Sequence, residues 1–426
     1  MPMDDYSGPF DPAATLAGFS RRALAVLGRE YMLFGHLLNR AALPSVHMKL
    51  GAAAREAVAI EEWMGASPIY TRRMQRAMRF AGDDVATIMK GLQLDVGFAH
   101  QYMDVRYELE SPRHGFFWLP SCGALLEVEP FGEEAVFSMC HSIEDPTFDA
   151  TAVATNPRAR CRPIHRPPRQ PADRVPHCRW EISIDPEAEP VAEIALTQRV
   201  RASRLAGLEL TPLPEDDAGG RRDYSGPFDP DFHLEVLSHA ALVRVCSELL
   251  IQNHLLIRAL MLTVADRAGA AVARDIGRTQ WIGAGVVAAS RLREALRISS
   301  DGMDAILKVL QLHPTFPPGY TRLGVELLSP ARGRFWLEDC EALHEADTCT
   351  WFALLDEAPP PALEAIVQAV NPQARCIAAR PTGAARFAWD VVVDAAGTPA
   401  PEPPEVLFVR SSGTARFAFK AHALSD

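Results

Sequence analysis

Apolar side chains near the start of the chain recur at spacings of three and four residues, the pattern of a helix with one buried face. This stripe predicts a long first helix, and Asp11 followed by Pro12 is typical of an N-cap and a first helical position. The same periodicity predicts three more helices, at about 49–65, 68–81 and 83–92. The first stripe consists of Leu16, Phe19, Ala23, Leu27, Tyr31, Phe34 and Leu38.

Beyond Tyr102 the pattern changes to short apolar runs rich in Phe, Trp, Val and Ile and bounded by Gly and Pro. These runs predict strands at about 116–119, 134–140 and 177–184. In the last of them, alternate side chains share one face, which predicts that Cys178 and Trp180 point inward. Helices followed by an antiparallel sheet give an α+β fold.

The octapeptide DYSGPFDP occurs twice, at residues 5–12 and 223–230, an offset of 218 residues. A match of this length predicts a tandem duplication, with a first copy at 1–212, a linker at 213–222 and a second copy at 223–426. The same offset pairs His36 with His254, Trp63 with Trp281 and Cys122 with Cys340. It shortens to 215 at the NPRARC and NPQARC segments and to 209 at Trp180 and Trp389.

A duplicated domain is expected to pack as a pseudo-twofold pair inside one chain, because such repeats commonly descend from a homodimer. We therefore predict an intrachain pseudo-dimer whose halves meet face to face. His36 lies roughly opposite the apolar stripe of its helix and is a candidate for ligand binding. Because the second copy keeps this residue as His254, a role in packing, with both histidines near the contact between the copies, is the alternative.

Composition narrows the possible partners. The 426 residues are 48% hydrophobic and carry a formal net charge of −11, which argues against nucleic acid or an anionic membrane as the main partner. Small molecules or proteins are then the favoured partners. The start of the sequence shows no signal peptide, and polar side chains interrupt the longest apolar run, so we expect neither export nor a membrane span. Eight cysteines without an export signal indicate free thiols or metal ligands in the cytoplasm.

Comparison of the two copies singles out a cluster of cysteines and histidines. Five such residues of the first copy have no counterpart of the same type in the second: Cys140, His141, His165, His177 and Cys178. Thiolate and imidazole are the ligands that zinc and iron prefer. Together with Cys122, these side chains predict a metal site for zinc, or alternatively iron, with ligands drawn from Cys122, Cys140, Cys178, His165 and His177. Buried structural thiols are the alternative.

The segment PIHRPPRQPADRVPHC, residues 163–178, is too rich in proline for a helix or a central strand. It is either a linker or a stiff loop that holds the metal ligands. Its Arg166 and Arg169 could clamp a carboxylate or phosphate of a ligand, although loop arginines are often simply solvated.

Catalytic candidates lie close to Cys140. Glu144 or Asp145 could act as general base to a metal-bound water, with His141 beside them. The Asp-Pro pair at 145–146 is also an ordinary turn signal. No Walker loop, GxGxxG, GxSxG or HExxH motif occurs, so the usual supports for nucleotide, dinucleotide or serine hydrolase chemistry are missing.

The order of these features resembles a known family. A tryptophan in the helical half (Trp63, Trp281) is followed by Cys122, the glycine of EPFG, Cys140, an Asn-Pro pair and a final Cys-x-Trp at 178–180. This order is similar to that of the bacterial L-2-amino-thiazoline-4-carboxylate hydrolase-like proteins and, more remotely, to that of the 4-vinyl reductase small-molecule-binding domain.

The resemblance implies an α+β fold with a pocket between helices and sheet, and it places Cys122, Cys140 and Cys178 at the family's cysteine positions. The second copy departs at two of these three. Two functions stay open: a metal- or thiol-dependent hydrolase of a small C–N or C–S bonded substrate, with the first copy active, and a non-catalytic small-molecule-binding or sensory protein with a structural zinc site.

Overall fold

The computed structural model describes residues 2–214, 219–356, 360–411 and 419–426. It confirms the α+β class: 49% of the chain is helical, and two four-stranded antiparallel sheets each follow a set of helices. Residues 215–218 of the predicted linker lie outside the described part of the chain.

The first copy begins with three helices and continues into a sheet interrupted by short helices. Its elements are α1 (Arg21–Leu50), α2 (Ala52–Ala77), α3 (Val85–Leu92), β1 (Met103–Ser111), β2 (His114–Cys122), α4 (Gly123–Val128), α5 (Glu133–Phe137), α6 (Glu144–Val153), β3 (Ala159–His165), β4 (Cys178–Ile184) and α7 (Ala195–Arg201).

The second copy repeats this order with fewer short helices. Its elements are α8 (His239–Ala268), α9 (Ala270–Ala295), α10 (Met303–Leu312), β5 (Leu323–Ser329), β6 (Arg332–Glu338), α11 (Pro361–Val370), β7 (Ala374–Ala379), β8 (Ala385–Val393) and α12 (Glu405–Ser411). The strand orders correspond, β1-β2-β4-β3 in one sheet and β5-β6-β8-β7 in the other.

The long helices begin later than the sequence predicted. Ser20 caps α1 by accepting a hydrogen bond from the amide of Ala23, and Ser238 caps α8 in the same way. The predicted cap at Asp11 is wrong: its carboxylate accepts from the amide of Ala13 within a turn, at 2.9 Å. The reason is tertiary, because the segment before Ser20 crosses to the other copy.

Two further predictions fail locally. The expected helices at 49–65 and 68–81 are one continuous helix, α2, which contains Pro68 and packs against α6 and α8. The expected strand at 134–140 is helical instead, forming α5 and a π-helical turn at Ser138–Ile143. Glu133 and Glu134 favour the first turn of a helix, an effect that outweighed the short apolar run.

The strand prediction at 177–184 is confirmed in β4, where buried and half-buried residues alternate. Cys178, Trp180, Ile182 and Ile184 are its buried side chains, as expected from their shared face. This face of the sheet is turned toward the helices.

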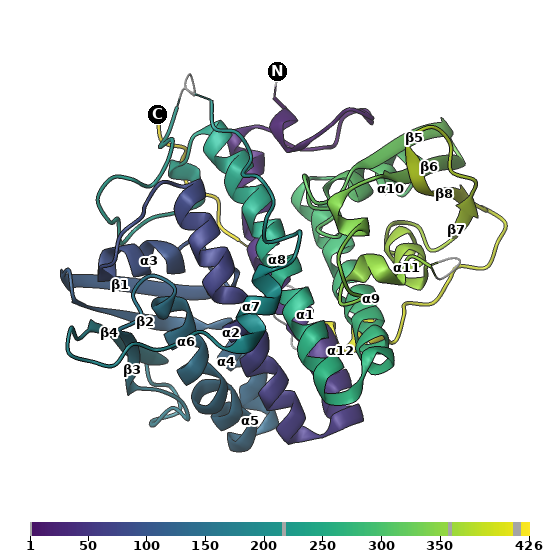
Figure 1. Ribbon diagram of the computed structural model, residues 1–426. Coiled ribbons are helices and arrows are strands. Elements are labelled where there is room, and N and C mark those ends of the chain that lie inside the picture. Colours follow the sequence, from purple (N-terminus) through teal and green to yellow (C-terminus); the bar gives the residue numbers. More distant parts are fainter. Residues whose placement is uncertain (1, 215–218, 357–359, 412–418) are drawn as a thin grey trace.

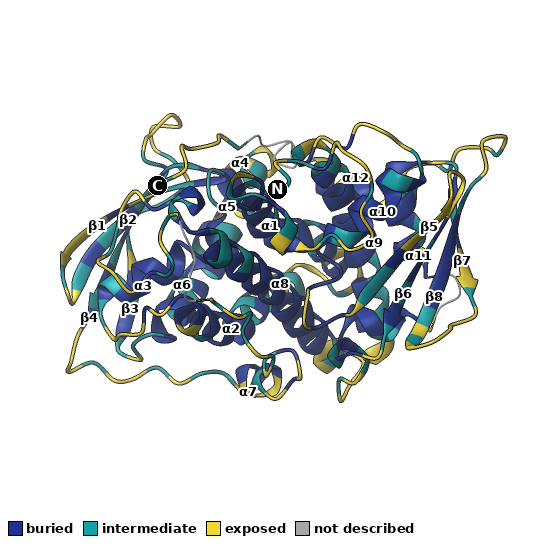
Figure 2. Cartoon of the chain, turned by 90° about the horizontal axis from the view of Figure 1, so that it is seen from above, coloured by how far each residue is buried: buried dark blue, intermediate teal, exposed yellow. Residues whose placement is uncertain are grey.

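The helices of the two copies form one central layer. α1 packs against α8 and α9, and α2 packs against α8, with one sheet at each outer end of the molecule (Figures 1 and 2). Of the helices in the described ranges, only α8 is long and apolar enough to cross a membrane, and 89% of its apolar window is buried inside the protein. Figure 2 shows α8 as part of the buried centre.

The repeated octapeptide forms two arms that are exchanged between the copies. The backbone amide of Tyr6, in the first arm, donates a hydrogen bond to the carbonyl oxygen of Leu296 in the second copy. The amide of Tyr224, in the second arm, donates in the same way to the carbonyl oxygen of Met78 in the first copy. The Tyr224 hydroxyl donates to Gln93 at 2.7 Å. Its counterpart in the first arm, the Tyr6 hydroxyl, donates to Gln311 at 2.9 Å.

A lysine completes each docking site. Lys90 donates to the carbonyl oxygens of Tyr224 and Gly226, and Lys308 donates to that of Gly8. Lys90 and Lys308 are again 218 residues apart. The octapeptide is therefore repeated together with the surface that receives it, which explains why the two are preserved in the same register.

Charged pairs between the copies are reciprocal as well. Arg73 binds Glu248 through two N–O contacts of 2.9 Å, and Arg291 binds Glu30 at the corresponding positions. His36 and His254, however, do not lie at this contact as predicted. Each packs inside its own copy, because the opposite face of α1 and α8 is the one that meets the other copy.

Candidate functional site

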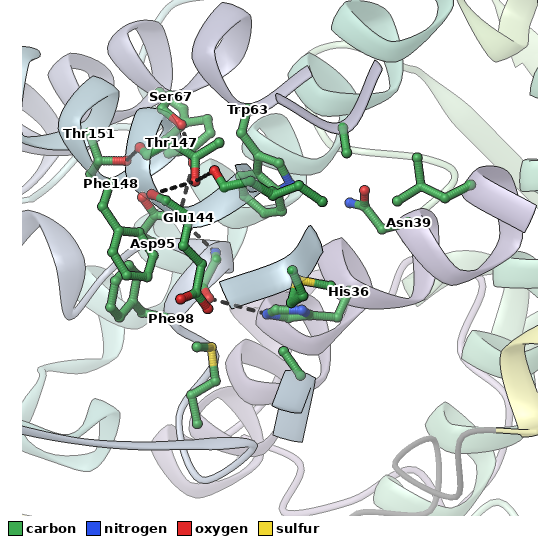
Figure 3. Close-up of a pocket in the computed structure, with 18 residues that line it drawn as sticks. His36, Asn39, Trp63, Ser67, Asp95, Phe98, Glu144, Thr147, Phe148 and Thr151 are labelled. Carbon is green, nitrogen blue, oxygen red and sulfur yellow. Dashed lines mark hydrogen bonds between the residues drawn. The ribbon is translucent and has the colours of Figure 1, made fainter. Parts of the chain in front are cut away.

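The first copy encloses a cavity of about 100 Å³ between α1, α2 and the α4–α6 region (Figure 3). Its wall is mostly apolar and contains Trp63, Phe98, Met139 and Phe148. The polar side chains on the wall are His36, Asn39, Ser67, Tyr70, Asp95, Glu144, Thr147 and Thr151. A few polar groups in an apolar, enclosed space are typical of a small-molecule site.

Asp95 is the most strongly held acid on this wall. One carboxylate oxygen accepts from the Tyr70 hydroxyl at 3.0 Å and from the amide of Gly97 at 2.7 Å. The other oxygen has no hydrogen-bond partner, although the side chain is only 2% exposed. Burial raises the pKa of Asp95 to about 7, against the effect of these two donors. The Ser67 hydroxyl lies 2.9 Å from that of Tyr70 and extends the chain of hydrogen bonds.

Glu144 is the second acid in the cavity. It begins α6, directly after the π-helical turn Ser138–Ile143, a type of distortion that is frequent at functional sites. Its side chain is buried, and one carboxylate oxygen has no hydrogen-bond partner. Burial raises the pKa of Glu144 to about 8, and the nearby Arg166 only partly opposes this. The first copy thus holds two carboxyl groups that titrate near neutral pH.

His36 lies on the same wall and is neutral. Its Nε2 atom is 3.2 Å from the carbonyl oxygen of Gly97, and its ring packs on Tyr102 at 4.6 Å. Burial, and then the charge of Arg40, lower its pKa to about 3. The predicted ligand-binding position of His36 therefore coincides with a cavity, and its ring can serve there as an uncharged hydrogen-bonding group.

The three predicted cysteine ligands cluster around Glu144. Burial raises the thiol pKa of Cys122, Cys140 and Cys178, and the charge of Glu144 is the next cause for each of them. For Cys122 the value is about 12. Its sulfur also accepts from the amide of Leu125 at 3.4 Å, at the start of α4. All three are therefore thiols, not thiolates, at neutral pH.

The predicted ligands His165 and His177 and the predicted catalytic residue His141 all contact the backbone. His165 Nε2 lies 3.2 Å from the carbonyl oxygen of Pro176, and His141 Nε2 lies 2.7 Å from that of Pro167. His177 Nδ1 accepts from the amide of Cys122 at 3.2 Å. These contacts bind the proline-rich loop to the domain. Among the residues described, no group of three or more His, Cys, Asp or Glu side chains is arranged to hold a metal ion.

Both loop arginines are engaged by carboxylates of the protein. Arg169 binds Glu129 through two contacts of 2.8 Å, and Arg166 pairs with Asp145. Asp145 is consequently an ion-pair partner at the surface, with 45% of its side chain exposed, whereas its neighbour Glu144 faces the cavity. The arginines fix the loop over α6, and their predicted use as a ligand clamp would require these pairs to open.

The equivalent space in the second copy is filled. Trp351 stacks on Trp281 with ring centres 5.4 Å apart and an angle of 8°, and its edge meets His254. Phe352 stacks on the other side of His254 at 5.8 Å. Trp281 and His254 are the counterparts of Trp63 and His36, which line the cavity in the first copy. Among the described residues, the first copy has a cavity beside Trp63 and His36, and the second copy has aromatic rings beside Trp281 and His254.

Sequence reasoning missed Asp95, Tyr70 and Ser67, although the 218-residue offset carried a signal. At that offset these residues become His313, Ala288 and Gly285, so the polar group is lost or changed along with the cavity. The differences in cysteine and histidine between the copies do not point to this network. The differences in carboxyl and hydroxyl residues at the same offset do indicate it.

No family model matches the sequence, and no curated protein or solved structure matches it either. The resemblance to the L-2-amino-thiazoline-4-carboxylate hydrolase-like proteins therefore stays a prediction. The fold and the cavity define an α+β protein of two similar halves, with a cavity between the helices and the α4–α6 region of the first half.

Proposed function

We propose that the first copy hydrolyses a small compound with a C–N or C–S bond, bound in the cavity beside Asp95 and Glu144. The observation that carries this proposal is the pair of buried carboxyl groups with pKa values of about 7 and about 8 on one cavity wall, each with an oxygen that lacks a partner. Titratable groups with shifted pKa values in one enclosed site are typical of acid–base catalysis.

The two acids can act as base and as acid because their pKa values differ. Between pH 7 and 8 more than half of Asp95 is ionised and can take a proton from a water molecule, while more than half of Glu144 is protonated. Glu144 can then donate its proton to the departing nitrogen or sulfur atom. The Tyr70 hydroxyl and the Gly97 amide hold the Asp95 carboxylate in position. The second copy serves as the structural partner.

The three thiols contribute in one of two ways. As they stand, their raised pKa values make them poor nucleophiles, and they lie near Glu144 as neutral groups that are not part of the cavity wall. Bound zinc or iron would need their deprotonation and a rearrangement of the side chains around Glu144. The acid–base mechanism above does not depend on such an ion.

The test is a panel of linear and cyclic amides, amidines and thioesters of five to eight non-hydrogen atoms, with products identified by mass spectrometry. We expect turnover that rises with pH through about 7 and falls through about 8, following Asp95 and Glu144. Asp95→Asn and Glu144→Gln should each reduce kcat at least 100-fold. His313→Asn, at the position of Asp95 in the second copy, should retain activity.

Binding without turnover would support the second open function, a small-molecule-binding or sensory protein. The enclosed, largely apolar cavity favours binding in either case. If the panel is bound but no product forms with the wild-type protein at any pH between 6 and 9, the hydrolase proposal is wrong and the binding function replaces it.

A further inference from the structure

The side chain that fills the cavity in the second copy indicates what the first copy binds. Trp351 is fully buried there, its ring lies flat on Trp281, and its indole N–H donates to the side-chain oxygen of Gln280 at 3.2 Å. In the second copy, this space is thus filled by a flat conjugated ring that carries one N–H donor.

The first copy keeps the receiving groups but lacks the ring. Trp63 corresponds to Trp281 and lines the open cavity, and Glu62 corresponds to Gln280. Glu62 directly precedes Trp63 in α2 and interacts with Asn39. Trp63 and Asn39 line the cavity, and Glu62 is buried next to these two wall residues without lining the cavity itself. Where Gln280 accepts the indole N–H, Glu62 offers a carboxyl group.

This carboxyl group is buried, and the protein offsets only part of the cost. Glu62 is 0% exposed, and neither of its oxygens has a hydrogen-bond partner of standard geometry. Burial raises its pKa well above the usual range, and the nearby Asn39 amide compensates only in part. An acceptor left in this state inside a protein is destabilising, so its retention needs a reason.

We propose that the cavity of the first copy binds a flat, single-ring nitrogen heterocycle that stacks on Trp63 and donates an N–H to Glu62, as Trp351 does to Gln280 in the second copy. The inference rests on the proposed function only for the use of the same cavity. It adds the class of ligand, which the acids alone do not define.

Size and charge restrict the ligand further. About 100 Å³ is smaller than the roughly 150 Å³ cavity known to hold benzene, so one five-membered ring fits, and a fused ring such as indole does not fit without movement of the wall. Asp95 and Glu144 are buried acids on the cavity wall, and the buried Glu62 lies next to the wall residues Trp63 and Asn39. They favour an uncharged or cationic ring over an anionic one.

The experiment uses pyrazole and isoxazole, two flat five-membered rings. Isoxazole has an oxygen atom in the place of the N–H group of pyrazole. Calorimetric titration of the full-length protein should show pyrazole binding at one site per chain. We expect isoxazole to bind at least 10-fold more weakly, because it leaves the Glu62 oxygen without a donor. Equal affinities for the two rings would overturn the proposal.

Substitutions locate the site. Glu62→Gln introduces the residue of the second copy and keeps an acceptor, so pyrazole affinity should remain within about threefold, whereas Glu62→Leu should remove the preference for pyrazole over isoxazole. Gln280→Leu is the matched control and should leave that preference unchanged. A preference that survives in Glu62→Leu would contradict the assigned acceptor.

The second copy provides an independent test. Trp351→Ala should open a second cavity, so that indole raises the melting temperature of this variant more than that of the wild type, by refilling the vacated space. If indole stabilises both proteins equally, Trp351 is not a stand-in for a ligand. Turnover measurements stay separate: a protein that binds pyrazole as expected but hydrolyses nothing supports this inference and refutes the hydrolase.

Discussion

Arg73 and Glu248 form a bidentate ion pair between the two copies, with side chains only 2% and 3% exposed. Arg73 also donates to the carbonyl oxygens of Ala206 and Leu208, so its guanidinium is held by partners from both halves of the chain. Buried charges of this kind are costly when one partner is removed. The pair therefore makes the contact between the copies specific.

We expect Arg73→Met to lower the free energy of unfolding by about 3 to 5 kcal/mol, because it leaves Glu248 charged and buried. Urea denaturation followed by circular dichroism measures this. The double variant Arg73→Met/Glu248→Leu should recover most of the loss. If the double variant is as unstable as the single one, packing and not the unpaired charge is responsible.

The exchanged arms give a matched pair of predictions. Tyr224→Phe removes the hydroxyl that donates to Gln93, and Tyr6→Phe removes the one that donates to Gln311. Each change should cost about 1 kcal/mol of unfolding free energy, and the two should add, because the contacts share no partner. If the double variant loses no more unfolding free energy than one single variant does, the two arms are not docked independently.

The buried acids predict an unusual dependence of stability on pH. The pKa of Glu144 is raised to about 8 in the folded protein, so folding favours its protonated form. The stability that follows is present at pH 4 and is lost as the pH rises from about 5 to about 8. Glu144→Gln should remove this part of the decline and stabilise the protein at pH 8.5 by about 1 to 3 kcal/mol.

Thermal unfolding of the wild type and Glu144→Gln at pH 5.5 and 8.5 measures this difference. Glu187→Gln, a change at an exposed carboxylate, is the control and should leave the pH dependence as it is. If the wild-type protein gains more stability than Glu144→Gln on going from pH 5.5 to pH 8.5, the raised pKa of Glu144 is refuted.

Any metal should bind to one copy only. The cysteine cluster around Glu144 has just one counterpart in the second copy, Cys340, so we expect zinc or iron at no more than one ion per chain. Elemental analysis of the purified protein gives the ratio. Cys178→Phe, which introduces the residue found at Phe387, should abolish binding of such an ion, and Cys340→Ala should not. Two ions per chain would contradict the cluster as the site.

Local patterns in the sequence sufficed for the class of fold. The inward face of β4 follows from alternation around Trp180, and the duplication follows from the octapeptide, since both are properties of short segments. Asp11 shows where such reasoning ends. Its local signal for an N-cap is good, but the arm that contains it is committed to contacts with the second copy, which no local pattern reveals.

The site was predictable in part for the same reason. Glu144 and His36 were singled out and do line the cavity. His165, a predicted metal ligand, and His141, a predicted catalytic residue, lie within hydrogen-bond distance of carbonyl oxygens of the loop. A histidine's partner depends on backbone groups far away in sequence. Asp95 was missed because a single acid in an apolar stretch has no motif, and its raised pKa comes entirely from the burial that tertiary packing produces.

The filled space around Trp351 has an evolutionary consequence. In a dimer of identical chains, every substitution appears in both subunits, so a cavity cannot be closed on one side alone. Fusion into a single chain removes that constraint. One half can then exchange its cavity for a core of stacked aromatic rings, while the other keeps the cavity and its buried, destabilising acids. Duplication within one chain thereby allows a packed core and an open cavity to be selected in separate halves of one molecule.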